Sequence, residues 1–199
     1  AVREAYHGWT LASDAVTTSL ADNPRAMETR PAWVHFASAP NSYRGVHRGA
    51  EARQGYAAEV AAVIDGLAAS GKPAAAYIAE PVFGNAGGVM LPEGYLVAAY
   101  AATRRHGGLC IADEVQVGYG RLGHRWWGHE DQGVVPDMIT IAKAMGNGHP
   151  LGAVITTRAI ADAFSAQGSF FSSAGGSPVS CVAALAVLDA VRDEGLQAN

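Results

Sequence analysis

The stretch IADEVQVGYGRLG, residues 111–123, joins the end of an apolar run to a glycine-rich segment. Gly118, Gly120 and Gly123 spell G-x-G-x-x-G, a pattern that in dinucleotide-binding folds follows a strand directly and opens a helix. Here four residues separate Asp113 from the first glycine. The segment after the last glycine is too rich in glycine, aromatic and turn residues for a long helix. The pattern therefore disfavours a dinucleotide site and indicates that the glycines shape a loop.

Outward from this stretch, short apolar runs alternate with helical patterns. The patterns predict strands at 73–80, 109–114, 137–143 and 151–157, helices at 51–71, 94–107 and 177–195, and mostly loop with one short strand at 27–50. Short and almost continuously apolar strands, separated by helices or long loops, are typical of a parallel sheet that is covered on both faces. The sequence thus predicts an α/β fold with a mostly parallel sheet.

Composition limits the class of protein. The chain has 199 residues, about one domain, and a formal net charge of −4, so no broad basic face for nucleic acid or an anionic membrane is expected. No apolar run reaches the roughly 18 residues of a membrane span, and the start does not read as a signal peptide. We therefore expect a globular cytoplasmic protein with small-molecule partners.

Two sets of residues that could suggest a metal site or a disulfide are weak candidates. Cys110 and Cys181 form no C-x-x-C pair, and both are expected to be buried small hydrophobic residues. His124, His129 and Asp131 lie in a stretch with no helix to bring them to one face. We expect no metal ion.

Three predicted strands carry functional groups where they end: Glu80, Asp113 and Lys143. In open parallel sheets, ligands bind beyond the carboxyl ends of the strands. An acid and an amine there could form a structural ion pair. They could also serve pyridoxal phosphate (PLP), whose aldehyde forms a Schiff base with a lysine and whose pyridine nitrogen pairs with a carboxylate. Residue types and positions alone leave both interpretations open.

Longer motifs resemble a known family. CIADEVQVGYGRLG followed by PDMITIAKAMGNGHPLGAVITT resembles the signature of class III PLP-dependent aminotransferases, which have the three-layer α/β architecture of fold-type I. The resemblance runs from YHGWT, through AEPVFGNAGGVMLPEGY, to FFSSAGGSPVSCVAALAVLD, and is weakest over residues 11–70. GNGHP and GGSPVSC are most similar to the subgroup that contains alanine-glyoxylate aminotransferases of the second type and ethanolamine-phosphate phospho-lyases.

The resemblance implies a role for each matching residue. Lys143 would be the Schiff-base lysine, and Asp113 would pair with the pyridine nitrogen. Gln116 would lie near the phenolic oxygen of the ring, and Tyr6 with His7 would form the aromatic floor or edge against which the ring rests. Without the family, Gln116 would be read as a solvated loop residue and YHG as an ordinary aromatic turn.

Two further site residues follow from the resemblance, with one departure from it. Ser173 takes the place of a threonine whose hydroxyl reaches the cofactor phosphate of the neighbouring subunit. Glu80 matches an acid beside the active site, although a glutamate paired with an arginine is an equal alternative. Many members of the class carry a second glutamate in EPVxGEGG, whereas this chain has EPVFGNAGG, which puts the family's switch between two carboxylate substrates in doubt.

The resemblance also implies how the enzyme is organised. Residues 1–199 would be the central part of the PLP-binding large domain, with the phosphate-binding turn upstream and the small domain downstream, and the enzyme would be a homodimer. The expected function is transamination between an amine or amino acid and a keto acid. A phospho-lyase acting on a phosphorylated amino alcohol is the first alternative, and a truncated, non-catalytic fragment is the second. The isolated fragment is expected to be inactive.

Overall fold

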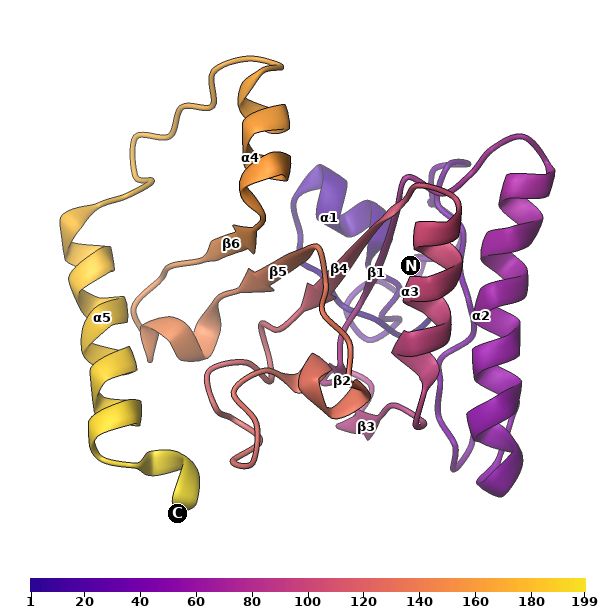
Figure 1. The fold of residues 1–199 in the computed structure, drawn as a ribbon, viewed down its shortest axis with the longest axis horizontal. Helices are drawn as coiled ribbons and strands as arrows, with labels where there is room; N and C mark the ends of the chain where they lie inside the picture. The colour runs from indigo at the N-terminus through magenta and orange to yellow at the C-terminus, as the bar shows by residue number, and fades with distance from the viewer.

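The computed structural model describes all of residues 1–199 and contains a four-stranded sheet at its centre (Figure 1). The strand order is β1 (Ala76–Ala79), β4 (Leu109–Asp113), β5 (Met138–Ile141) and β6 (Ala153–Thr156). β1, β4 and β5 run parallel, and β6 pairs antiparallel with β5. The predicted α/β class with a mostly parallel sheet is confirmed, and all four predicted strands are present.

The helices and the small hairpin surround this sheet. Their bounds are α1 (Leu11–Val16), α2 (Ala52–Ala69), α3 (Tyr95–Arg105), α4 (Arg158–Ser165), α5 (Pro178–Asp193), the hairpin β2 (Val82–Phe83) with β3 (Val89–Met90), and the 3-10 turns η1 (Gly49–Glu51), η2 (Gly128–Gln132), η3 (Lys143–Gly146) and η4 (Leu196–Ala198). The three predicted helices are confirmed. None of the helices combines the length and apolar character needed to cross a bilayer.

The structure differs from the sequence-based prediction in three local places. α1 and α4 were not predicted, because they are short and begin at the threonine caps Thr10 and Thr157 rather than at a long apolar period. The strand expected within 27–50 is only a single bridge between Val2 and Ala37. Cys181 is exposed, so the expectation that both cysteines are buried is wrong for it.

The main core lies between one face of the sheet and the pair of helices α2 and α3, which pack side by side (Figure 1). Large apolar and aromatic side chains fill it, among them Tyr56, Tyr77, Tyr95 and Leu96. The Tyr77 hydroxyl donates to the Tyr95 hydroxyl at 3.2 Å, and burial raises the pKa of Tyr77 well above its ordinary value. Burial also raises the pKa of the Cys110 thiol to about 12, so this cysteine is an inert core residue.

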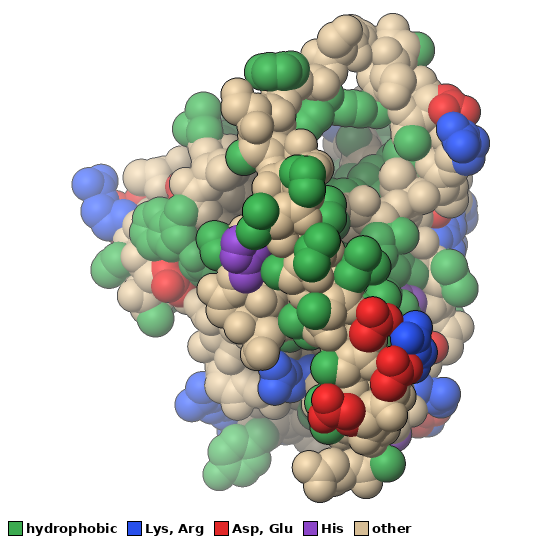
Figure 2. Space-filling model, turned by 90° about the vertical axis from the view of Figure 1, so that its left-hand side faces the viewer, with side chains coloured by type: hydrophobic (Ala, Val, Ile, Leu, Met, Phe, Trp, Pro, Cys, Tyr) green, Lys and Arg blue, Asp and Glu red, His purple; other side chains and the backbone are tan.

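The C-terminal elements pack less completely. α5 buries only Ala184, which contacts Ile141 and Met145 at the end of β5 and in η3. The rest of this region exposes many large apolar side chains, including Val154, Phe164, Phe170, Phe171, Val179, Val182 and Leu185. Figure 2 shows apolar side chains gathered over the face that carries α5. α5 therefore supports the turn after β5 while leaving an apolar outer face.

Candidate active site

Asp113 ends β4 and is buried at the carboxyl edge of the sheet. His7 Nδ1 donates to its Oδ2 at 2.7 Å, and the backbone N–H of Val115 donates to its Oδ1 at 3.1 Å. The side chains of His7 and Asp113 are 2% and 7% exposed, so the pair is almost entirely shielded from water. Two donors thus hold the Asp113 carboxyl group in place at the end of the strand.

The backbone of the YHG segment explains how His7 reaches this carboxylate. The N–H of His7 donates to Thr17 Oγ1 at 2.8 Å, and the same hydroxyl donates to the carbonyl of Gly8 at 3.1 Å. Gly8 has a φ of +115°, and a Cβ there would lie 3.0 Å from Ser13 Oγ. Only glycine accommodates this turn without strain. Thr17 is a residue that the sequence analysis missed, and a single threonine in a loop carries no pattern by which to find it.

Glu80 follows β1 and fastens the same segment to the hairpin. Its Oε1 accepts from the N–H of Tyr6 at 2.9 Å, and its Oε2 accepts from the N–H of Gly84 at 2.9 Å. Burial raises the pKa of this carboxyl, and the two backbone hydrogen bonds oppose that shift. The alternative of a glutamate paired with an arginine is wrong, since both of its oxygens bind backbone N–H groups. Glu80 thus acts on the position of Tyr6.

Lys143 lies just beyond β5, which ends at Ile141, two residues earlier than a strand over 137–143 would require. Its backbone turns out of the sheet with a φ of +42° and begins η3. Its Nζ lies 5.8 Å from the centre of the Tyr6 ring, within the range of a cation–π contact. The lysine amine therefore contacts Tyr6, and Asp113 contacts His7, the next residue along the chain.

The backbone of Lys143 is strained, because a side chain in the left-handed region costs roughly 1–2 kcal/mol. Glycine adopts this region without that cost. We expect Lys143→Gly to be more stable than Lys143→Ala by about 1 kcal/mol, measured by chemical denaturation of the two variants. The matched control is Lys72, which lies outside the sheet at a position without positive φ, and there the alanine variant should be at least as stable as the glycine variant. Equal stabilities of Lys143→Gly and Lys143→Ala would contradict the proposed backbone strain.

Gln116 is brought to the same place by close packing on a glycine. A Cβ at Gly84 would lie 2.8 Å from Gln116 Cγ, so the glutamine side chain covers the backbone that Glu80 holds. Ser173 is not brought to the other predicted residues. It lies exposed in the loop between α4 and α5, which stands away from the carboxyl edge of the sheet (Figure 1).

The glycine-rich segment forms a loop, as predicted. Gly120 and Gly123 have φ values of +72° and +77°, and no α-helix follows them before β5. The neighbouring acid Glu114 is fully buried and accepts from the N–H of Gly128 at 2.8 Å and from His129 Nδ1 at 2.7 Å. Glu114 therefore anchors η2 beneath the sheet edge. The sequence analysis gave it no role.

His124, which was considered with His129 and Asp131 as a metal ligand, lies apart from the Glu114–His129 pair. His124 Nε2 lies 2.8 Å from Asp131 Oδ1 in an exposed contact, whereas His129 faces Glu114. The three residues therefore have two different sets of partners.

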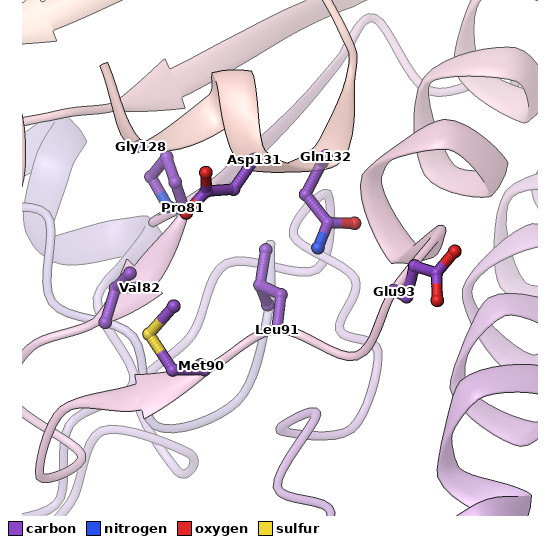
Figure 3. Close-up of a pocket in the computed structure, with 8 residues that line it drawn as sticks. All are labelled: Pro81, Val82, Met90, Leu91, Glu93, Gly128, Asp131 and Gln132. Carbon is purple, nitrogen blue, oxygen red and sulfur yellow. The ribbon is translucent and has the colours of Figure 1, made fainter. Parts of the chain in front are cut away.

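A small cavity lies beside the hairpin and does not coincide with the site (Figure 3). Its volume is about 200 Å³, and it is lined by Pro81, Val82, Met90, Leu91, Glu93, Gly128, Asp131 and Gln132. None of the predicted site residues lines it. The candidate site is instead the arrangement of Asp113, His7, Tyr6, Lys143 and Gln116 at the carboxyl edge of the sheet.

Known proteins share both this sequence and this fold. The family described as Aminotransferase class-III matches residues 1–199. An alanine–glyoxylate aminotransferase 2-like protein of Drosophila melanogaster is 43% identical over 199 residues, which cover 97% of this chain and 40% of the relative. The chain thus spans about two fifths of the length of this curated relative.

Two solved structures resemble the chain closely. A phospholyase from Arthrobacter in complex with phosphoethanolamine has a TM-score of 0.84 and 36% identity, over 99% of this chain and 46% of that one. An amine transaminase from an uncultivated Pseudomonas species, in its PLP-bound form, has a TM-score of 0.85 and 33% identity, over 99% and 46%. Both structures confirm the expected fold-type I class. Because the match covers the whole chain in sequence and fold, residues 1–199 belong to the class-III aminotransferase family.

Proposed function

We propose that residues 1–199 form the central part of the cofactor-binding large domain of a PLP-dependent aminotransferase. The observation that carries this proposal is the convergence of Asp113 and Lys143 at the carboxyl ends of neighbouring parallel strands, with the Tyr6–His7 dipeptide contacting both. The phosphate-binding turn and the small domain would be supplied by chain outside these residues. Family membership and the PLP-bound relative support the assignment.

The residues present fit this cofactor. A pyridine ring that carries a proton on its nitrogen needs a buried carboxylate, and Asp113 is buried with acceptor capacity left on both oxygens. An aldehyde needs an amine nearby, and Lys143 has an exposed side chain above the Tyr6 ring. A buried nitrogen, His7 Nε2, has no partner, which is consistent with a polar group that is still to be bound.

Each residue then has a separate task. PLP, when bound, accepts the electron pair left on a substrate carbon that has lost a proton. Lys143 Nζ would hold the cofactor aldehyde and, as a free amine, would move the proton at the substrate carbon. Asp113 would keep the ring nitrogen protonated, and His7 Nδ1 holds that carboxylate in place. Tyr6 would lie against the ring, and Gln116 would lie near its phenolic oxygen.

The assembly and location are part of the same proposal. The enzyme is a homodimer in which the Ser173 hydroxyl binds the cofactor phosphate of the neighbouring subunit. The exposure of the loop that carries Ser173 supports this arrangement. A cytoplasmic location is proposed as well, and fractionation of cells that express the enzyme tests it.

The substrates are a small amine or amino acid and a keto acid, with elimination of phosphate from a phosphorylated amino alcohol as the second candidate. A specific observation favours keeping the second candidate. Asn85 stands where the family's second glutamate is found, and its Nδ2 donates to Asp22 Oδ2 at 2.8 Å. An amide offers no carboxylate at this place, and the phosphoethanolamine-bound relative shares 36% identity.

The experiment tests the enzyme of family length in two assays. The first contains phosphoethanolamine without a keto acid, and the second contains an amine with pyruvate or glyoxylate. We expect the second assay to form a new amino acid, and the amine without a keto acid to leave the cofactor aminated. Release of phosphate in the first assay, with the cofactor unchanged, would overturn transamination in favour of the phospho-lyase. Residues 1–199 alone are the control and should turn over neither mixture, because the chain that anchors the cofactor phosphate lies outside them.

A further inference from the structure

Few buried polar side-chain atoms in this chain lack a partner, and two of the four side chains that carry them adjoin Asp113. The side chains that carry them are His7, Arg30, Tyr100 and Thr140. His7 contacts Asp113 directly, and Thr140 is the register partner of Asp113 on the neighbouring strand. An unmade hydrogen bond in a buried place costs stability, so an orphaned hydroxyl beside the central carboxylate calls for an explanation.

The sheet register defines the surroundings of Thr140. Residues paired across parallel strands direct their side chains to the same face, and the partners of Thr140 are Asp113 on β4 and Val154 on β6. Its neighbour on that face along β5 is Met138. Of these three, only Asp113 offers an oxygen acceptor. Neighbouring strands lie about 4.8 Å apart, so the side chains of Thr140 and Asp113 stand next to each other on that face.

The carboxylate has room for this donor. An ionised carboxylate offers about four acceptor positions, and Asp113 uses two, one for His7 Nδ1 and one for the Val115 N–H. One of the remaining positions is needed for the protonated ring nitrogen. The other is available to a hydroxyl on the β5 side.

We propose that Thr140 is a positioning residue for Asp113: its hydroxyl donates to the carboxylate when the cofactor ring is engaged, and orients it toward the ring nitrogen. The inference rests on the proposed function, because Asp113 needs such orientation only if it serves the ring. The hydroxyl is buried without a partner in the structure, and this donation would supply one.

The test is Thr140→Val in the enzyme of family length, because valine keeps the shape and removes the hydroxyl. Loss of an orphaned hydroxyl should raise the unfolding midpoint of the cofactor-free enzyme by roughly 2–4 °C. Loss of a hydrogen bond to a charged group should weaken PLP binding, followed by absorbance titration, and lower kcat by about 10-fold. Thr140→Ser, which restores the hydroxyl, should recover both PLP affinity and kcat.

Thr156→Val is the matched control on the same sheet face. Thr156 Oγ1 donates to the carbonyl of Asp137 at 2.8 Å, so this variant should lower the unfolding midpoint and leave PLP affinity and kcat unchanged. Wild-type PLP affinity and kcat in Thr140→Val would overturn the proposal. A lowered midpoint in Thr140→Val, or a serine variant as impaired as the valine one, would also overturn it.

Failure of this inference is distinct from failure of the proposed function. If the wild-type enzyme neither binds PLP through Lys143 nor turns over amines, the proposed function is wrong and the Thr140 proposal falls with it. If the wild-type enzyme does both and Thr140→Val equals it, only the role of Thr140 is lost.

Discussion

Lys143→Ala in the enzyme of family length is expected to lower turnover by roughly 10⁴-fold or more, because the variant loses both the covalent link to the cofactor and the base that moves the proton. The chain contains only one other lysine, Lys72, which gives a clear competing assignment. Borohydride reduction of the loaded enzyme, followed by peptide mass mapping, should find the cofactor on the peptide that contains Lys143.

Lys72→Ala is the control for that experiment. Lys72 is exposed and precedes β1, so it lies toward the amino ends of the parallel strands, opposite to Asp113. Its removal should leave the reduced adduct and the turnover unchanged. Cofactor found on Lys72, or normal turnover in Lys143→Ala, would refute the proposed role of Lys143.

Asp113→Asn is expected to keep the fold and the bound cofactor while slowing removal of the substrate proton by roughly 10²–10³-fold. Asparagine has nearly the same shape as aspartate, but it carries no charge to hold a proton on the ring nitrogen. Single-turnover kinetics, started by mixing loaded enzyme with amine, measure this step separately from binding.

Asp65→Asn is the matched substitution away from the site. Asp65 is a half-exposed acid on α2 that pairs with Arg105 at 2.7 Å, and pairs open to solvent contribute little to stability. This variant should react at the wild-type rate. If Asp113→Asn also reacts at a near-normal rate, the carboxylate has no part in holding the ring proton.

The principal elements of the fold could be predicted because their signals are local. Each strand of the sheet is an apolar run of a few residues, and α2, α3 and α5 have long helical patterns with turn residues beyond them. The short helices α1 and α4 escaped notice because six and eight residues carry too little periodicity. The antiparallel direction of β6 is not encoded in its composition either, since it depends on where η3 and the loop after it return the chain.

The residues of the candidate site also differ in whether a local sequence pattern predicts them. Asp113 and Lys143 stand out in the sequence because each closes an apolar run, and parallel strands bring such ends to one edge. The contact between His7 and Asp113 joins residues 106 positions apart, and no local sequence pattern predicts it. Glu80 and Glu114 are both strand-end acids in the sequence, yet one holds the Tyr6 backbone and the other holds η2.

The sequence by itself determined the fold class, the family and the two residues on which the proposed chemistry depends, because apolar periodicity and strand-end residues act over a few neighbouring positions. Tertiary structure alone decided which donors surround Asp113, that Lys143 leaves the sheet in a left-handed conformation, and that a buried Thr140 hydroxyl without a partner lies on the strand beside Asp113. These features depend on strand register and on contacts between distant segments. Register is set by the packing of the whole sheet, and no single stretch of the chain contains it.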